Sequence, residues 1–191
     1  MIYEALSCVI EDINNNLKRK LQINEDKVIL SGIINQDGSI AMQGENKMLV
    51  TLINVEKETA RAAAGNSAAG GMFGTTPASV CINLYVLFAA YFSANNYPQA
   101  LRFLSYTIAY FQSKNIFTAQ NTPALDSSIS KLAFELESPG QDRLNNMWAT
   151  LGAKYMPSVL YKVRMLTFDD SIIKEYRPAV AGTAGEALPA R

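Results

Sequence analysis

The side chains that enzymes most often use for acid–base and nucleophilic chemistry are scarce in this chain. Its 191 residues include no histidine, the side chain whose unperturbed pKa best suits proton transfer near neutral pH. A catalytic Cys–His or Ser–His pair is therefore impossible. The two cysteines, Cys8 and Cys81, lie far apart in the sequence and lack the close spacing typical of a zinc site. A magnesium or calcium site made of carboxylates alone stays open, although no EF-hand pattern is present.

A glycine-rich segment invites comparison with phosphate-binding loops. Gly65 and Gly70 have the spacing of the two glycines in GxxxxGK[ST]. Gly71 and Met72 stand where that motif requires Lys and then Ser or Thr, so the match fails. The short acidic clusters at 56–58 and 169–170 are typical of solvated surface. We therefore expect no catalytic residue, no cofactor and no metal site, and we interpret the protein as a non-enzyme.

Composition excludes several other classes of function. Lysines plus arginines number 17, as do aspartates plus glutamates, and no basic stripe is present to attract phosphate, so nucleic acid is not an expected partner. The longest nearly apolar run, 81–92, is shorter than the roughly 18–20 residues that a membrane span needs. The N-terminal residues form an amphipathic pattern and not a signal peptide. We expect both thiols to stay reduced and buried in a cytosolic product.

The pattern of apolar residues predicts one α+β domain, a mixed sheet packed by helices. The expected helices cover 2–21, 98–114 and 139–151. The expected strands cover 27–33, 47–57, 79–92, 131–137 and 159–166, with a short extended piece at 116–118. Both faces of strand 47–57 are largely apolar, so we expect both to be covered. The domain covers 1–170.

Two segments lack such a pattern. Residues 60–77 are small and glycine-rich, which predicts a flexible loop without regular structure. Residues 171–191 are rich in Ala, Gly and Pro and predict a flexible tail. Long loops of this kind in a compact domain are commonly functional.

The most distinctive stretch is 144–166. Its first part has an apolar stripe at helical spacing, and Gly152 provides a C-cap. Ser138 and Pro139 predict the start of this helix as N-cap and first helical residue. The second part alternates as a strand, with Lys162 and Arg164 on one face. The helical stripe comprises Leu144, Met147, Trp148 and Leu151, and its tryptophan is expected in the core.

This stretch, taken in order with YPQALRFLSYTIAYFQ from Tyr97, NTPALD from Asn121 and KLAFELES from Lys131, resembles one family. Residues 1–168 resemble the tail-terminator, or cap, proteins of phage-tail-like contractile injection particles of the antifeeding-prophage and virulence-cassette type. The resemblance implies a phage tail-terminator-like fold and a homo-oligomeric ring, expected to be sixfold. The ring would sit at the baseplate-distal end, stop polymerisation of tube and sheath, and hold the last sheath layer.

The resemblance further implies three partners: the chain itself, the inner tube protein and the sheath protein. Assembly would take place in the bacterial cytoplasm, in a particle that is released or cell-anchored. A sheath-associated adaptor or an assembly chaperone of the same particle is the alternative. The candidate partner contacts are Gly70, Gly71, Met72, Phe73, Lys162, Arg164, Tyr176 and Arg177.

Overall fold

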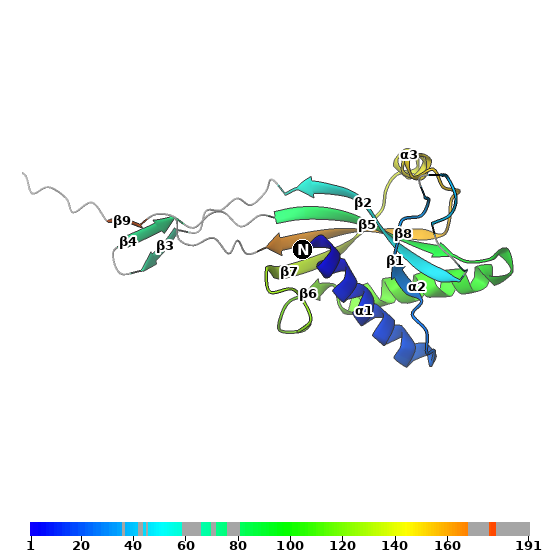
Figure 1. The fold of residues 1–191 in the computed structure, drawn as a ribbon, viewed down its shortest axis with the longest axis horizontal. Helices are drawn as coiled ribbons and strands as arrows, with labels where there is room; N and C mark the ends of the chain where they lie inside the picture. The colour runs from blue at the N-terminus through cyan, green and yellow to red at the C-terminus, as the bar shows by residue number, and fades with distance from the viewer. Residues whose placement is uncertain are drawn as a thin grey trace, which may run out of the picture.

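A mixed six-stranded sheet with helices on both faces forms the main body of the protein (Figure 1). The computed structural model describes residues 1–35, 37–41, 44, 46–58, 66–69, 72–75, 81–167 and 176–178. The strands lie in the order β1-β2-β5-β8-β7-β6. Only β1 and β2 run parallel, and every other neighbouring pair in this sheet is antiparallel. The α+β prediction with a mixed sheet is confirmed.

The bounds of the elements follow the apolar pattern closely. The helices are α1 (Ile2–Leu21), α2 (Tyr97–Ser113) and α3 (Gln141–Leu151), with a short 3-10 helix at Ala94–Asn96. The strands of the main sheet are β1 (Val28–Leu30), β2 (Lys47–Lys57), β5 (Cys81–Tyr91), β6 (Ile116–Phe117), β7 (Ile129–Glu137) and β8 (Ser158–Thr167).

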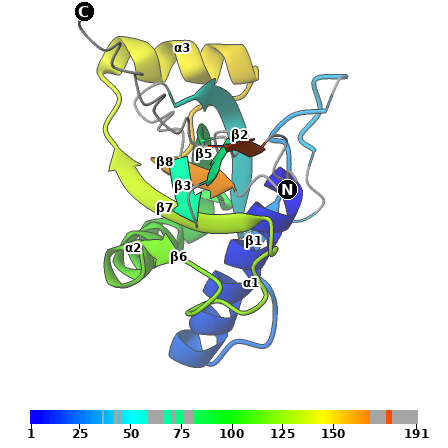
Figure 2. The same ribbon diagram turned by 90° about the vertical axis from the view of Figure 1, so that its left-hand side faces the viewer.

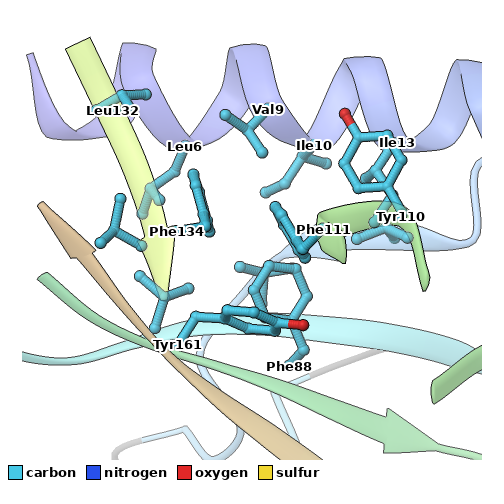
Figure 3. Packing of buried hydrophobic residues seen from close by; sticks show 14 of the residues in the cluster. Leu6, Val9, Ile10, Ile13, Phe88, Tyr110, Phe111, Leu132, Phe134 and Tyr161 are labelled. Carbon is cyan, nitrogen blue, oxygen red and sulfur yellow. The ribbon is translucent and has the colours of Figure 1, made fainter. Parts of the chain in front are cut away.

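Helices α1 and α2 cover one face of this sheet and enclose the larger core (Figures 1 and 2). Alternate residues of β5 and β8 point into it because successive strand residues face opposite sides. An aromatic group lies at its centre (Figure 3), where Phe111 of α2 stacks on Phe134 of β7 at 4.4 Å between ring centroids and contacts Tyr161 of β8 at 4.6 Å. This packing fixes β7 and β8 beneath α2.

Helix α3 covers only part of the opposite face, over a smaller core. Trp148 is buried there among Leu49, Leu87 and Leu160, which confirms its predicted core position. Figure 2 shows α3 and the α1/α2 pair on opposite sides of the strands. Helix α3 is short, so the smaller core ends near Tyr85 of β5 and leaves the adjoining ends of β2 and β8 uncovered on this face. The prediction that both faces of β2 are covered is therefore correct only for its first half.

Of the two predicted caps of α3, one is wrong and one is confirmed. Helix α3 begins after Gly140, which is extended (φ −61°, ψ 163°) and whose carbonyl accepts the first helical hydrogen bond from Leu144. Ser138 lies two residues before this N-cap, so the prediction that it caps the helix is wrong. In α2, Leu101 is exposed and the buried face centres on Phe103, Thr107 and Tyr110. The predicted C-cap is confirmed, since Gly152 adopts φ 66°.

A second, three-stranded sheet corrects the description of 60–77 as a loop without strands. It pairs β3 (Asn66–Ala69), β4 (Met72–Thr75) and β9 (Tyr176–Pro178) in antiparallel fashion. In Figure 1 this small sheet lies beyond one end of the six-stranded sheet. The segments expected to be separate, the loop and the tail, therefore contribute strands to one sheet.

Candidate interaction surfaces

The described residues contain no cluster that suits metal binding or nucleophilic catalysis. No group of three or more Cys, Asp or Glu among them could hold a metal ion. Cys8 and Cys81 are free thiols; Cys8 is buried, as predicted, whereas Cys81 is only partly buried. Burial raises the pKa of both thiols, and the carboxylates of Asp12 and Glu58 respectively raise it further. A thiol with a raised pKa stays protonated near neutral pH and is a poor nucleophile.

Lys162 and Arg164, two of the predicted contact residues, lie on the α3 side of β8. Arg164 is exposed, and its Nε lies 3.5 Å from Glu58 and 3.8 Å from Glu135. Lys162 is opposite Tyr85 on one neighbouring strand and Glu135 on the other. Arg164 therefore sits beyond the part of this face that α3 covers, whereas Lys162 is partly buried at its limit, beside Tyr85.

Arg164 belongs to a polar patch that the sequence analysis missed. We define the polar patch as Glu56, Glu58, Asn83, Tyr85 and Arg164. The amide of Asn83 donates to Glu58 at 3.1 Å, and the hydroxyl of Tyr85 donates to Glu56 at 3.1 Å. The guanidinium of Arg143, on α3, lies 5.6 Å from the centre of the Tyr85 ring. Asn83 and Tyr85 are themselves buried, so the groups of the patch that a partner could contact are the exposed side chains of Glu56 and Arg164.

A bulge in β2 creates the polar patch. Its register against β5 shifts between Leu52 and Asn54, so that Glu56 lies opposite Asn83. Without the shift, strict alternation from Leu49 would turn Val55 and Lys57 to this face. The only signal in the sequence is the change from an apolar to a charged pattern near Asn54.

The small sheet brings together four of the predicted contact residues. Phe73 of β4 is opposite Arg177 of β9, and the neighbouring pairs are Met72 with Pro178 and Gly74 with Tyr176. Gly70 and Gly71 lie outside the described residues. Loop and tail candidates are thus neighbours, a pairing that no periodicity in these short segments could predict.

One edge of the six-stranded sheet is closed by a side chain. Asn14 of α1 is 5% exposed and accepts hydrogen bonds at its Oδ1 from the backbone N–H groups of Lys27 (3.0 Å) and Val28 (2.9 Å). Its Nδ2 donates to the carbonyl of Val28 at 2.7 Å. The side chain therefore occupies the backbone groups that β1 would otherwise offer to another strand.

A second polar contact joins the two helices of the larger core. Asp12 of α1 accepts hydrogen bonds from Lys114 Nζ at 2.6 Å and from the hydroxyl of Tyr110. Burial alone would raise the pKa of Asp12, but the hydrogen bonds from Lys114 and Tyr110 outweigh it and lower the pKa below its usual value. Burial, and then the bond to Asp12, raises the pKa of Tyr110. The carboxylate therefore stays ionised and fixes α1 to the end of α2.

No helix among the described residues is long and apolar enough to cross a membrane.

Comparison with solved structures supports the fold. The chain is similar, at 17% identity and a TM-score of 0.59 over 95% of its length, to the sheath/tube terminator of the PVC extracellular contractile injection system in its extended state. It is also similar, at 18% identity and a TM-score of 0.58 over 92% of its length, to the tube-terminating cap of the anti-feeding prophage. It spans 64% and 60% of those two chains, respectively.

Comparison with sequences gives a consistent result. No curated protein matches the chain. The family described as the Pvc16 N-terminal domain matches residues 9–181, which include most of α1, the whole of α2 and α3, the six-stranded sheet and the small sheet. Because the match covers most of the sequence, the chain belongs to the Pvc16 N-terminal domain family.

Proposed function

We propose that this protein is a structural cap at the baseplate-distal end of a contractile injection particle, where it ends tube and sheath polymerisation. The observation that carries the proposal is the family match over 9–181, together with a fold shared with a sheath/tube terminator and a tube-terminating cap. The absence of histidine, and two thiols with raised pKa values, fit a role without catalysis.

The physical mechanism is occupation of a growing end. A polymer of stacked rings presents at its end the heterologous surface that receives the next ring. A protein that binds this surface without repeating it stops growth. Such a cap would form a homo-oligomeric ring, sixfold to match the tube, and would be assembled in the bacterial cytoplasm with the rest of the particle.

A cap of this kind needs two sets of interfaces, between its own subunits and towards the tube and sheath. A specific interface commonly buries on the order of 1,600 Å² in total. The polar patch on β2, β5 and β8 and the small sheet are the surfaces we assign to these contacts, with Lys162, Arg164, Phe73 and Arg177 among the contact residues. The sheath contact uses either the segment from Ser171 onward or an edge of the main sheet, by strand addition.

Segments 60–77 and 171–191 are proposed to become fully ordered on assembly. Limited proteolysis of the free protein and of purified particles tests this. Equal resistance of both segments in the two states would contradict it. Deletion of 171–191 separates the two routes to the sheath, because retention of the truncated cap after contraction would exclude donation by the tail.

Electron microscopy of particles from cells that lack this chain tests the function as a whole. Overlong or uncapped tubes and sheaths would establish termination. Normal, capped particles would refute it. The composition of purified particles adds a second test, since a chaperone would be missing from them and a cap would be present in stoichiometric amount.

A further inference from the structure

A hollow with an apolar floor and a polar rim lies between the end of α1, the segment that leads into β1, and the first half of α2. Its volume is about 320 Å³. We call it the basic hollow: its floor comprises Leu21, Ile23, Phe103 and Tyr106, and its rim comprises Glu25, Lys27, Gln99 and Arg102. Phe103, 7% exposed, belongs to the larger core, but the other floor residues are only partly buried, so apolar surface is accessible here.

Basic side chains that are far apart in the sequence gather around this hollow. Two belong to the last turn of α1, two to the rim, and one to the start of β2, from which it reaches the rim carboxylate. The five are Lys18, Lys20, Lys27, Arg102 and Lys47. The neighbouring carboxylates are those of Glu25 and Asp26. Positive charge is therefore in excess, and spacing along the sequence gives no sign of this cluster.

Ion pairs within the chain neutralise only part of this charge. Lys27 and Lys47 share the carboxylate of Glu25, with Lys47 Nζ 3.0 Å from one of its oxygens and Lys27 paired with the other. Hydrogen bonds from Lys27 and then from Lys47 lower the pKa of Glu25, so this carboxyl stays ionised near neutral pH. Lys18 pairs with Asp26 at 2.8 Å. Two carboxylates thus face three lysines.

The start of α2 adds to the positive potential. Arg102 is exposed, and in the part of the chain that the structure describes no ion pair involves Arg102 or Lys20. The N-cap residue Asn96 makes no side-chain hydrogen bond to the helix, and the first turn, which contains Gln99 of the rim, has no acidic residue. No carboxylate of this turn offsets the partial positive charge of the helix N-terminus.

Charge and apolar floor together define one class of occupant. A carboxylate can accept two parallel hydrogen bonds from the guanidinium of Arg102. The apolar floor favours a ligand that also buries an apolar side chain. A nucleic acid fits less well, because its closely spaced phosphates would lie against the ionised carboxylate of Glu25. An acidic peptide segment with one aliphatic or aromatic side chain matches both the rim and the floor.

We propose that the basic hollow binds an acidic peptide segment, whose apolar side chain lies on the floor and whose flanking carboxylates lie beside Arg102 and Lys27. The inference goes beyond the capping role and does not depend on it. The hollow adjoins β1, at the opposite end of the strand order from β7 and β6, and shares no residue with the polar patch. It is therefore an additional interaction surface of the chain.

Fluorescence anisotropy of the full chain with a labelled synthetic peptide, Gly-Asp-Glu-Leu-Asp-Glu-Gly, tests the proposal at low salt. Replacing the leucine of the peptide by serine is expected to weaken binding at least about tenfold, because the floor then buries no apolar side chain. Replacing its acids by the corresponding amides should weaken binding by at least about as much. No binding of the acidic peptide at about 1 mM would overturn the proposal.

Two further outcomes of the same titration would also overturn it. Equal affinity for the leucine and serine peptides would show attraction between charges without use of the floor. Tighter binding of inorganic pyrophosphate or of a thymidine oligonucleotide than of the acidic peptide would identify a phosphate site in its place.

A matched pair of variants locates the binding. Arg102→Glu reverses the charge on the rim, whereas Lys154→Glu makes the same change of charge at an exposed residue beyond α3 that does not line the hollow. The affinity for the acidic peptide is expected to fall at least about tenfold for Arg102→Glu and to stay within about twofold for Lys154→Glu. Equal affinities of the two variants would contradict the proposal.

Nuclear magnetic resonance gives a second readout that needs no variant. On addition of the acidic peptide, the largest amide shift changes are expected at Ile23 and Phe103, on the two sides of the hollow. The Asn145 amide of α3 is the internal control and is expected to stay unchanged. Shift changes that exclude Ile23 and Phe103 would place the peptide elsewhere and overturn the inference, while the proposed capping function would stand.

Discussion

The two edges of the six-stranded sheet end differently. At β1, the side chain of Asn14 takes up the outward backbone groups of Val28, and α1 covers the strand. At β7, the pairing with β6 stops after two residues and leaves Leu136 exposed between two apolar pockets. A protein that must avoid strand addition closes both edges. Asn14 thus closes the β1 edge at Val28, whereas no described strand pairs with the β7 edge at Leu136.

The largest effect is expected from removing the central aromatic ring that holds β7 in the larger core. Phe111→Ala deletes the ring that contacts Phe88, Phe134 and Tyr161 at the centre of the larger core. Because the surrounding rings cannot fill the space, the free energy of unfolding should fall by about 3–5 kcal/mol. Urea denaturation measures it. A loss below about 1 kcal/mol would show that β7 is not held by this aromatic group.

Opening the closed edge is expected to have the next largest effect. Asn14→Ala leaves the backbone N–H and C=O of Val28 buried without their partner, which should lower the free energy of unfolding by about 2–3 kcal/mol. The exposed edge should also increase self-association, which sedimentation velocity detects. Asn15→Ala, at the neighbouring exposed position of α1, is the control and should change stability by less than about 0.5 kcal/mol.

The pH dependence of the free energy of unfolding is expected to reflect the contact of Asp12 with Lys114 and Tyr110. This contact fixes α1, the helix that carries Asn14, against α2. The lowered pKa of Asp12 means that its contribution is present above the unfolded-state pKa of about 3.9 and is lost as the pH falls through the lower folded-state value. Asp12→Asn should therefore reduce stability by about 1 kcal/mol at pH 7, given its partial exposure. The difference from the unchanged protein should disappear below about pH 3. A difference that persists there would indicate packing and not charge.

The edges also show how far the sequence predicts the structure. Among the described residues, period-3.6 and period-2 patterns placed the three α-helices and all strands of the main sheet, but not the short 3-10 helix, and the bounds of 47–57 were reproduced without change. The role of Asn14 could have been suspected, because it lies in the apolar arc between Ile10 and Leu17. The length of β6, which decides how much of β7 stays open, depends on where α2 ends against the sheet. That is a tertiary property with no local signal.

The site was predicted less well than the fold for a related reason. Lys162 and Arg164 share a face as expected, since alternation alone requires it. The partners of Arg164 on β2 depend on the bulge near Asn54, and the proximity of Phe73 to Arg177 depends on pairing across about a hundred residues. Register and long-range pairing are set by the packed sheet, so sequence periodicity cannot supply them.

The smallest effect on stability is expected at the open edge itself, and this sharpens the contrast with Asn14. Leu136 is 53% exposed, and its outward backbone groups contact no described strand, so Leu136→Glu removes little buried surface and breaks no hydrogen bond of the isolated protein. Its free energy of unfolding should change by less than about 0.5 kcal/mol, as for most surface substitutions. Urea denaturation of Leu136→Glu beside Asn14→Ala makes the comparison directly. If Leu136→Glu were as destabilising as Asn14→Ala, the edge of β7 would already be engaged within the chain, and it could not serve as the free edge that the strand-addition proposal needs.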